Sequence, residues 1–131
     1  MFGGRDYMAK ESRTAQDIWI TVRKNNKNYR TKWQAYPVTI NKVTCAAHKL
    51  IKDPEHWTVT ELQTGRKIAM RGDNKTIEDA IKNAKTDIKQ KSKQYSMTFP
   101  EMIAKSLKIH GTVRSLPEWE GSYKEDQDKG A

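Results

Sequence analysis

Residues 18–36 read IWITVRKNNKNYRTKWQAY, and this stretch decides the fold. Its first five residues are all β-branched or aromatic, and alternation places Ile18, Ile20 and Val22 on one side of an extended chain. Its last eight residues also alternate, with Tyr29, Thr31, Trp33 and Ala35 on one face and Arg30, Lys32 and Gln34 on the other. The pattern predicts two strands, of which the second is half-buried and has a basic outer face.

Residues 23–28 lie between these strands and are too polar to belong to a core. Three of the six are asparagines, which tolerate left-handed backbone conformations, so we expect a hairpin loop here. Pro37 follows the second strand, and we expect it to end that strand because proline cannot donate a backbone hydrogen bond.

The sheet is expected to continue through three further strands. Residues 42–51 fit both a helical stripe and a strand face, and the weak helix formers Thr44 and Cys45 favour the strand. A second hairpin is predicted from residues 57–62, a tight turn containing Gly65, and residues 67–71.

Two capped helices are predicted in the second half of the chain. Thr76 precedes Asp79 by three residues, which is a variant of the capping box, and this helix is expected to fray near Ser92. Its apolar stripe consists of Ile77, Ala80, Ile81, Ala84 and Ile88. Thr98 and Glu101 have the same spacing at the start of a shorter helix, which Gly111 is placed to end.

These elements predict an α+β fold, with an antiparallel sheet of about five strands packed by one long helix and a second short C-terminal helix. We expect a flexible N-terminal arm over residues 1–16 and a single domain over residues 17–116. Residues 117–131 contain five acidic residues and two lysines, and we expect an acidic, disordered tail there.

The chain of 131 residues carries a formal net charge of +9, which favours contact with polyanions. Cys45 is the single cysteine, so no internal disulfide can form and a reducing compartment is expected. The sequence has no apolar run of signal-peptide or membrane-span length. We therefore expect a cytoplasmic protein with no membrane partner.

Catalytic and metal-binding patterns are absent from the sequence. It has three histidines and one cysteine, with no zinc-ligand spacing and no glycine-rich phosphate loop. Cys45 and His48 would point to opposite faces of a strand, so a nucleophile–base pair is not expected in that conformation. We predict that the protein is not an enzyme and has no cofactor and no metal site.

The strongest functional feature is the basic hairpin. Between residues 23 and 33 there is no acidic residue and there are five basic ones: Arg23, Lys24, Lys27, Arg30 and Lys32. Cations neutralise phosphates, and the interleaved Tyr29 and Trp33 could stack on unpaired bases. Alternation equally allows both aromatic side chains to point into the core. The sequence predicts binding of nucleic acid, either DNA or RNA, through the five basic residues.

A protein partner is the alternative. Trp119 lies beside Glu118 and Glu120, where an exposed tryptophan could anchor a partner protein. Docking of Trp119 onto its own domain is equally compatible with the sequence.

Residues 57–60, Thr64-Gly65, and residues 76–88 with Ala80 and Ala84 form a block that resembles one found in small uncharacterised bacteriophage proteins. The resemblance covers about a third of the chain. It implies a phage accessory protein in the host cytoplasm, without implying an activity. The alternative to nucleic-acid binding is that the protein docks on a host enzyme that handles nucleic acid, and inhibits or redirects that enzyme.

Overall fold

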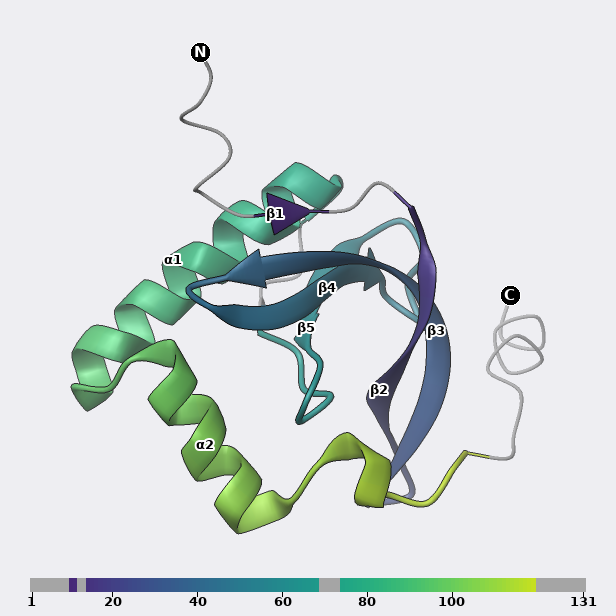
Figure 1. The fold of residues 1–131 in the computed structure, drawn as a ribbon. Coiled ribbons are helices and arrows are strands. Elements are labelled where there is room, and N and C mark those ends of the chain that lie inside the picture. The colour runs from purple at the N-terminus through teal and green to yellow at the C-terminus, as the bar shows by residue number, and fades with distance from the viewer. Residues whose placement is uncertain (1–9, 12–13, 69–73, 120–131) are drawn as a thin grey trace.

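The computed structural model describes residues 10–11, 14–68 and 74–119, which form an antiparallel sheet with two helices (Figure 1). The α+β class predicted from the sequence is confirmed. The strands are β1 (Lys10–Glu11), β2 (Gln16–Lys24), β3 (Lys27–Ile40), β4 (Val43–Lys49) and β5 (Trp57–Glu61). The helices are α1 (Ile77–Tyr95) and α2 (Phe99–His110), followed by a short 3-10 helix, η2 (Val113–Ser115).

The long strand β3 joins two parts of the sheet. Its first half pairs with β2, from Lys27 to Ala35, and its second half pairs with β4, from Tyr36 to Ile40. The prediction that Pro37 ends the strand is therefore wrong. Pro37 lies where β3 leaves β2 and begins to pair with β4, and a residue without an N–H is tolerated at such an exchange of neighbours.

Within residues 42–51, Val43–Lys49 form the strand β4, as favoured from the sequence. A two-residue turn, Asn41 and Lys42, has positive φ at both positions and leads directly from β3 into β4. The burial of four successive residues in β4, from Cys45 to His48, shows that both faces of this strand are covered. The helical alternative is therefore excluded.

The last predicted strand, residues 67–71, is not formed as a strand in the described residues. Lys67 makes one isolated bridge to Thr60, and the Ile68 N–H donates to the Val59 carbonyl at 2.7 Å. Residues 69–73 lie outside the described part of the chain. The sheet instead gains β1, which pairs with Val38 and Thr39 of β3 although it falls in the expected N-terminal arm.

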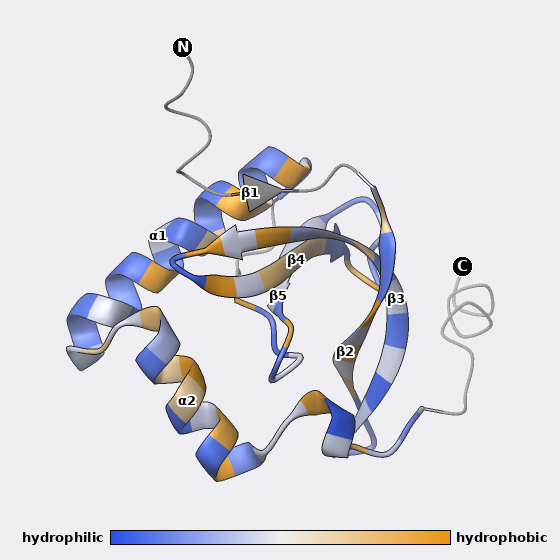
Figure 2. Cartoon of the chain, viewed as in Figure 1, coloured by the Kyte–Doolittle hydropathy of each residue, from blue (hydrophilic) through white to orange (hydrophobic). Residues whose placement is uncertain are grey.

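The helix α1 covers the sheet at β4 and β5 (Figure 1). The Thr76 hydroxyl accepts from the Asp79 N–H, as the capping pattern predicts, although the helix continues beyond Ser92 to Tyr95. Figure 2 shows apolar positions recurring along α1 between hydrophilic ones. The buried residues of α1 pack with β3, β4 and β5 in the main core: Ala80, Ile81, Ala84 and Ile88.

The second helix is also capped as predicted, with a reciprocal capping box between Thr98 and Glu101 and an end at Gly111. Only Phe99 of this helix is fully buried, and Met102 and Ile103 pack partly against the main core. The helix therefore covers much less of the core than α1 does.

The β2–β3 hairpin has a separate, smaller core. It consists of Ile20, Val22 and Ile51, with Tyr29, Trp33 and Trp119 partly buried around them. Both edges of the hairpin are occupied by other segments. The Thr21 N–H donates to the Gly65 carbonyl at 2.9 Å, and on the other edge the Arg30 N–H donates to the Pro117 carbonyl at 2.9 Å.

Residues 117–119 were expected in the acidic tail, but they lie along β3. The Trp119 N–H donates to the Arg30 carbonyl at 2.8 Å, and Glu118 forms a parallel bridge with Arg30. Residues 120–131, the rest of the expected tail, lie outside the described residues.

Candidate functional site

The tip of the β2–β3 hairpin is tighter than the sequence predicted. Only Asn25 and Asn26 form the turn, with φ of 52° and 63°, and both strands extend to the residues beside them. Two successive left-handed residues make the turn that matches the twist of a hairpin, and asparagine tolerates that conformation well. The expected six-residue loop is therefore wrong, and Arg23 and Asn28 lie opposite each other in paired strands.

Paired strands divide the hairpin into two faces. The outer face carries Trp19, Thr21, Arg23, Asn28, Arg30 and Lys32. The inner face carries Ile20 and Val22 on β2, and Tyr29 and Trp33 on β3, and these pack into the small core. The predicted alternation of residues 29–36 is confirmed, and the two aromatic side chains point into the core rather than toward a ligand.

The five predicted basic residues do not share one face. Arg23, Arg30 and Lys32 are on the outer face, whereas Lys24 and Lys27 fall on the inner side of the hairpin at its tip. The Lys24 ammonium lies 5.8 Å from the centre of the Trp119 ring. The predicted cluster is thus three outer cations and two cations on the opposite side.

Trp19 organises the outer cations. The Arg30 guanidinium lies 4.4 Å from the centre of the Trp19 ring, and the Lys32 ammonium lies 5.2 Å from it. Such cation–π contacts hold long side chains close to a surface without neutralising their charge. Lys32 and Arg23 are exposed, and Arg30 is half-buried.

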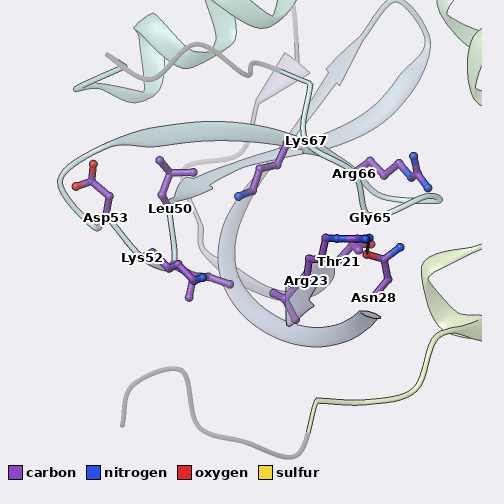
Figure 3. A pocket seen from close by; sticks show the side chains of 11 residues that line it. Thr21, Arg23, Asn28, Leu50, Lys52, Asp53, Gly65, Arg66 and Lys67 are labelled. Atoms are coloured by element: carbon purple, nitrogen blue, oxygen red, sulfur yellow. Dashed lines mark hydrogen bonds between the residues drawn. The ribbon is translucent and has the colours of Figure 1, made fainter. Parts of the chain in front are cut away.

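A pocket of about 560 Å³ opens beside β2, and no pattern in the sequence predicted it (Figure 3). We call it the basic pocket. Its walls are the end of the hairpin, residues 50–53, and residues 65–67. Val22, Leu50 and Ile51 supply apolar lining, and four cations surround it: Arg23, Lys52, Arg66 and Lys67.

The basic pocket has little negative charge of its own. Asp53 is the one carboxylate residue that lines it, and the His56 Nδ1 lies 2.5 Å from the Asp53 Oδ2. Lys67 is exposed on its outer side, yet the pocket walls strip part of its hydration and lower its pKa, and the charge of Lys52 lowers that pKa further. The two ammonium groups therefore lie close enough to repel each other.

The turn that carries Arg66 and Lys67 is fixed by a buried carboxylate. Glu61 accepts from the N–H groups of Gln63 at 2.6 Å and Thr64 at 2.8 Å. Gly65 has a φ of +72°, and a Cβ there would lie 2.5 Å from the Val113 side chain and 2.6 Å from the Thr21 hydroxyl. Only glycine fits this close approach, which places Arg66 beside β2.

The signal for Lys52, Arg66 and Lys67 could not come from local sequence. Lys52 is a single basic residue and Arg66-Lys67 a single basic pair, each in a short connection. They meet Arg23 only because Gly65 docks on β2. Arg66 also lines a small hollow with Thr21 and Asn28, so the pocket cations and the outer face are continuous.

Cys45 and His48 are both fully buried in β4. Burial, with a smaller effect of Glu61, raises the pKa of the Cys45 thiol to about 12, so the thiol stays protonated. Burial lowers the pKa of His48 to about 4, and the positive charge of Lys67 adds to this effect. Its ring nitrogens bond to the Lys49 carbonyl at 2.9 Å and the Thr60 hydroxyl at 2.6 Å, which assigns His48 to the packing of the sheet.

Trp119 lies against its own domain. Its ring meets Tyr29 edge-on, with 5.1 Å between the ring centres, and it joins the small core of the hairpin. Of the two positions that the sequence allowed, exposure toward a partner or docking onto its own domain, the structure shows the docked one.

Comparisons of the chain with protein-family models, with curated proteins and with solved structures find no match. In the part of the chain that the structure describes, neither helix is long and apolar enough to cross a membrane. Within the same residues, no three His, Cys, Asp or Glu side chains gather as metal ligands would.

Proposed function

We propose that this protein binds nucleic acid without catalysing a reaction on it, through the outer face of the β2–β3 hairpin. The observation that carries the proposal is the convergence of Arg23, Arg30 and Lys32 with the pocket cations on one continuous surface. Closely spaced cations bind a phosphate backbone because each one releases condensed counterions from it.

The hairpin also has a suitable shape. A two-stranded ribbon can enter a major groove, and Asn28 on the outer face could donate to a phosphate or a base edge. The aromatic residues Tyr29 and Trp33 are committed to the core, so the proposal relies on backbone contacts and not on base stacking.

The test is a triple charge reversal, Arg23→Glu, Arg30→Glu and Lys32→Glu, measured by fluorescence anisotropy with DNA and RNA over a range of salt concentrations. We expect an affinity loss of at least about 100-fold, and a log–log salt slope that falls by about 3, if each cation neutralises one phosphate. Lys82→Glu, Lys89→Glu and Lys93→Glu, at exposed positions of α1, form the matched control with the same loss of charge.

The control triple is expected to retain most of the affinity, because its cations lie on α1 and not on the hairpin. Reversal of the inner-side pair, Lys24→Glu and Lys27→Glu, is expected to have a smaller effect than the outer triple. Equal losses in the outer and control triples would reduce the proposal to nonspecific attraction by net charge.

Docking on a host protein is the second candidate function, and a groove between the end of α1 and α2 is a specific observation in its favour. Tyr95 and Ile109 are 57% and 63% exposed, and they line a groove of about 340 Å³ with Met97 and Met102. Exposed apolar side chains around a groove are typical of protein-binding surfaces. A pull-down from host lysate with and without nuclease separates this candidate from nucleic-acid binding, with Tyr95→Ser and Ile109→Ser as the variants expected to lose the partner.

A bacteriophage origin, an accessory or regulatory role and a location in the host cytoplasm belong to the same proposal. They rest on the resemblance of residues 57–60, Thr64-Gly65 and residues 76–88 to phage proteins.

A further inference from the structure

We infer that the basic pocket binds a single phosphorylated nucleoside, with its phosphate between Lys52 and Lys67 and its apolar part against Val22 and Ile51 (Figure 3). The inference rests on the proposed function for the identity of the ligand, since it takes the bound polyanion to be a nucleic acid.

Charge is the first argument. Arg23, Lys52, Arg66 and Lys67 come from three separate segments and converge on one opening. Among the described residues, no carboxylate lies within ion-pair distance of any of these four side chains. A phosphate between Lys52 and Lys67 would relieve the repulsion that their proximity creates, and it would be held by charge-assisted hydrogen bonds.

Size and lining are the second argument, and they favour a nucleotide over a bare anion. A volume of about 560 Å³ lies in the range of small-molecule pockets, roughly 300–1,000 Å³, and is far larger than one phosphate needs. The buried side chains of Val22 and Ile51 line it, which suits a base or sugar better than an ion. The apolar lining and the cations together match a ligand with one apolar end and one anionic end.

Rigidity is the third argument. Gly65 is wedged between Thr21 and Val113, and the Glu61 carboxylate holds the turn through two backbone N–H groups. The Arg23 guanidinium donates to the Asn28 side chain at 3.2 Å, which holds one cation at the hairpin wall. Such a preformed wall lowers the ordering cost of binding a small ligand.

Two ligands contain a single phosphorylated nucleoside: a free nucleoside monophosphate and the phosphorylated end of a nucleic-acid strand. Isothermal titration of the full chain with AMP, UMP, adenosine and inorganic phosphate tests the pocket itself. We expect both monophosphates to bind, and adenosine and inorganic phosphate to bind at least about 10-fold more weakly, since each keeps only the apolar or only the anionic end. A pair of oligonucleotides, with and without a terminal phosphate, then separates these two ligands.

The decisive variant is Lys52→Ala with Lys67→Ala, compared with Arg30→Ala and Lys32→Ala on the outer face. Both pairs remove two charges from side chains that make no hydrogen bond to another described residue, so the fold should persist, which circular dichroism checks. The pocket pair is expected to lose monophosphate binding by at least about 10-fold, while the outer pair keeps it.

Three results would overturn the inference: no monophosphate binding at millimolar concentration, equal binding of inorganic phosphate, or unchanged binding by the pocket pair. Tighter binding of the phosphorylated oligonucleotide assigns the site to strand ends, and equal binding of both oligonucleotides assigns it to free nucleotide. If the outer pair loses binding of long nucleic acid and neither the parent nor any variant binds a monophosphate, the proposed function stands. Only the inference about the pocket is then contradicted.

Discussion

The helix-covered part of the sheet and the β2–β3 hairpin differ in how they are stabilised. Among the described residues, the first packs β3, β4, β5 and the two helices around twelve buried residues, whereas the hairpin core has three. The hairpin core is completed by half-buried aromatic side chains and borders the basic pocket. The comparison indicates that stability is concentrated under α1, which leaves the hairpin free to present charge.

The largest expected effect comes from truncating one isoleucine in each core. Ile40→Ala removes a fully buried side chain from the helix-covered core and should cost about 4 kcal/mol of unfolding free energy. Ile20→Ala should cost about 2 kcal/mol, because the small core has fewer neighbours and can relax toward the pocket. Urea unfolding measures both, and Ile109→Ala at an exposed position is the control.

Equal costs for Ile40→Ala and Ile20→Ala would contradict the comparison. The hairpin would then be as much a part of the stabilising core as the sheet under α1.

A pH effect of similar size is expected in the helix-covered part alone. The pKa of His48 is lowered to about 4 by burial, from 6.5, so below pH 6.5 the unfolded chain takes up a proton that the folded chain resists. Stability from this residue is complete above pH 6.5 and is lost as the pH falls toward 4, by about 3 kcal/mol in total.

Denaturant unfolding at several pH values measures this loss, and His48→Gln removes the titration while keeping a polar side chain near Thr60. The variant should be less dependent on pH between 6.5 and 4 than the parent. Identical pH profiles for the two proteins would show that other groups cause the acid sensitivity.

The turn at Gly65, where the helix-covered part of the sheet meets β2, is expected to give the next largest effect on stability. Gly65→Ala combines a positive φ with a Cβ 2.5 Å from Val113, and should cost about 2–3 kcal/mol. Gly111→Ala is the matched control, since its φ is +76° but its Cβ would meet only the Ser115 hydroxyl at 3.2 Å. Gly111 also has a ψ of −173°, a conformation almost restricted to glycine, so this variant should cost about 1–3 kcal/mol from backbone strain alone and leave the turn at Arg66 in place.

Gly65→Ala should also weaken ligand binding beyond its effect on stability, because Arg66 and Lys67 follow the displaced turn. Thermal unfolding measures the stability of each variant, and fluorescence anisotropy measures its binding of nucleic acid. A Gly65→Ala protein with full nucleic-acid affinity would show that the turn does not need to lie against β2.

The same division explains what the sequence could predict. Periodicity identified the strands that became β2, β3 and β5, and the weak helix formers Thr44 and Cys45 favoured the strand that became β4. The capping patterns at Thr76 and Thr98 located the starts of both helices. These signals are local, and the helix-covered core agrees with all of them. Pro37 was misjudged because a tertiary event, the change of partner from β2 to β4, removed the usual cost of proline in a strand.

The candidate site was less predictable because it depends on long-range geometry. Alternation correctly separated Arg30 and Lys32 from Tyr29 and Trp33. It could not place Lys24 and Lys27, because their side depends on the length of the turn at Asn25 and Asn26.

The smallest expected effect on stability lies on the outer face itself. Arg30→Ala and Lys32→Ala each remove one cation–π contact with Trp19, at 4.4 and 5.2 Å, which is worth about 0.5–1 kcal/mol. Each should therefore change the unfolding free energy by less than about 1 kcal/mol and yet weaken nucleic-acid binding several-fold. Ile40→Ala should instead lower the unfolding free energy strongly and leave nucleic-acid binding unchanged, when binding is assayed at a temperature where the variant stays folded. The two residue types would then separate stability from binding on one continuous strand, since Ile40, Arg30 and Lys32 all belong to β3. Binding losses that follow stability in all three variants would mean that the hairpin is not an independent binding surface.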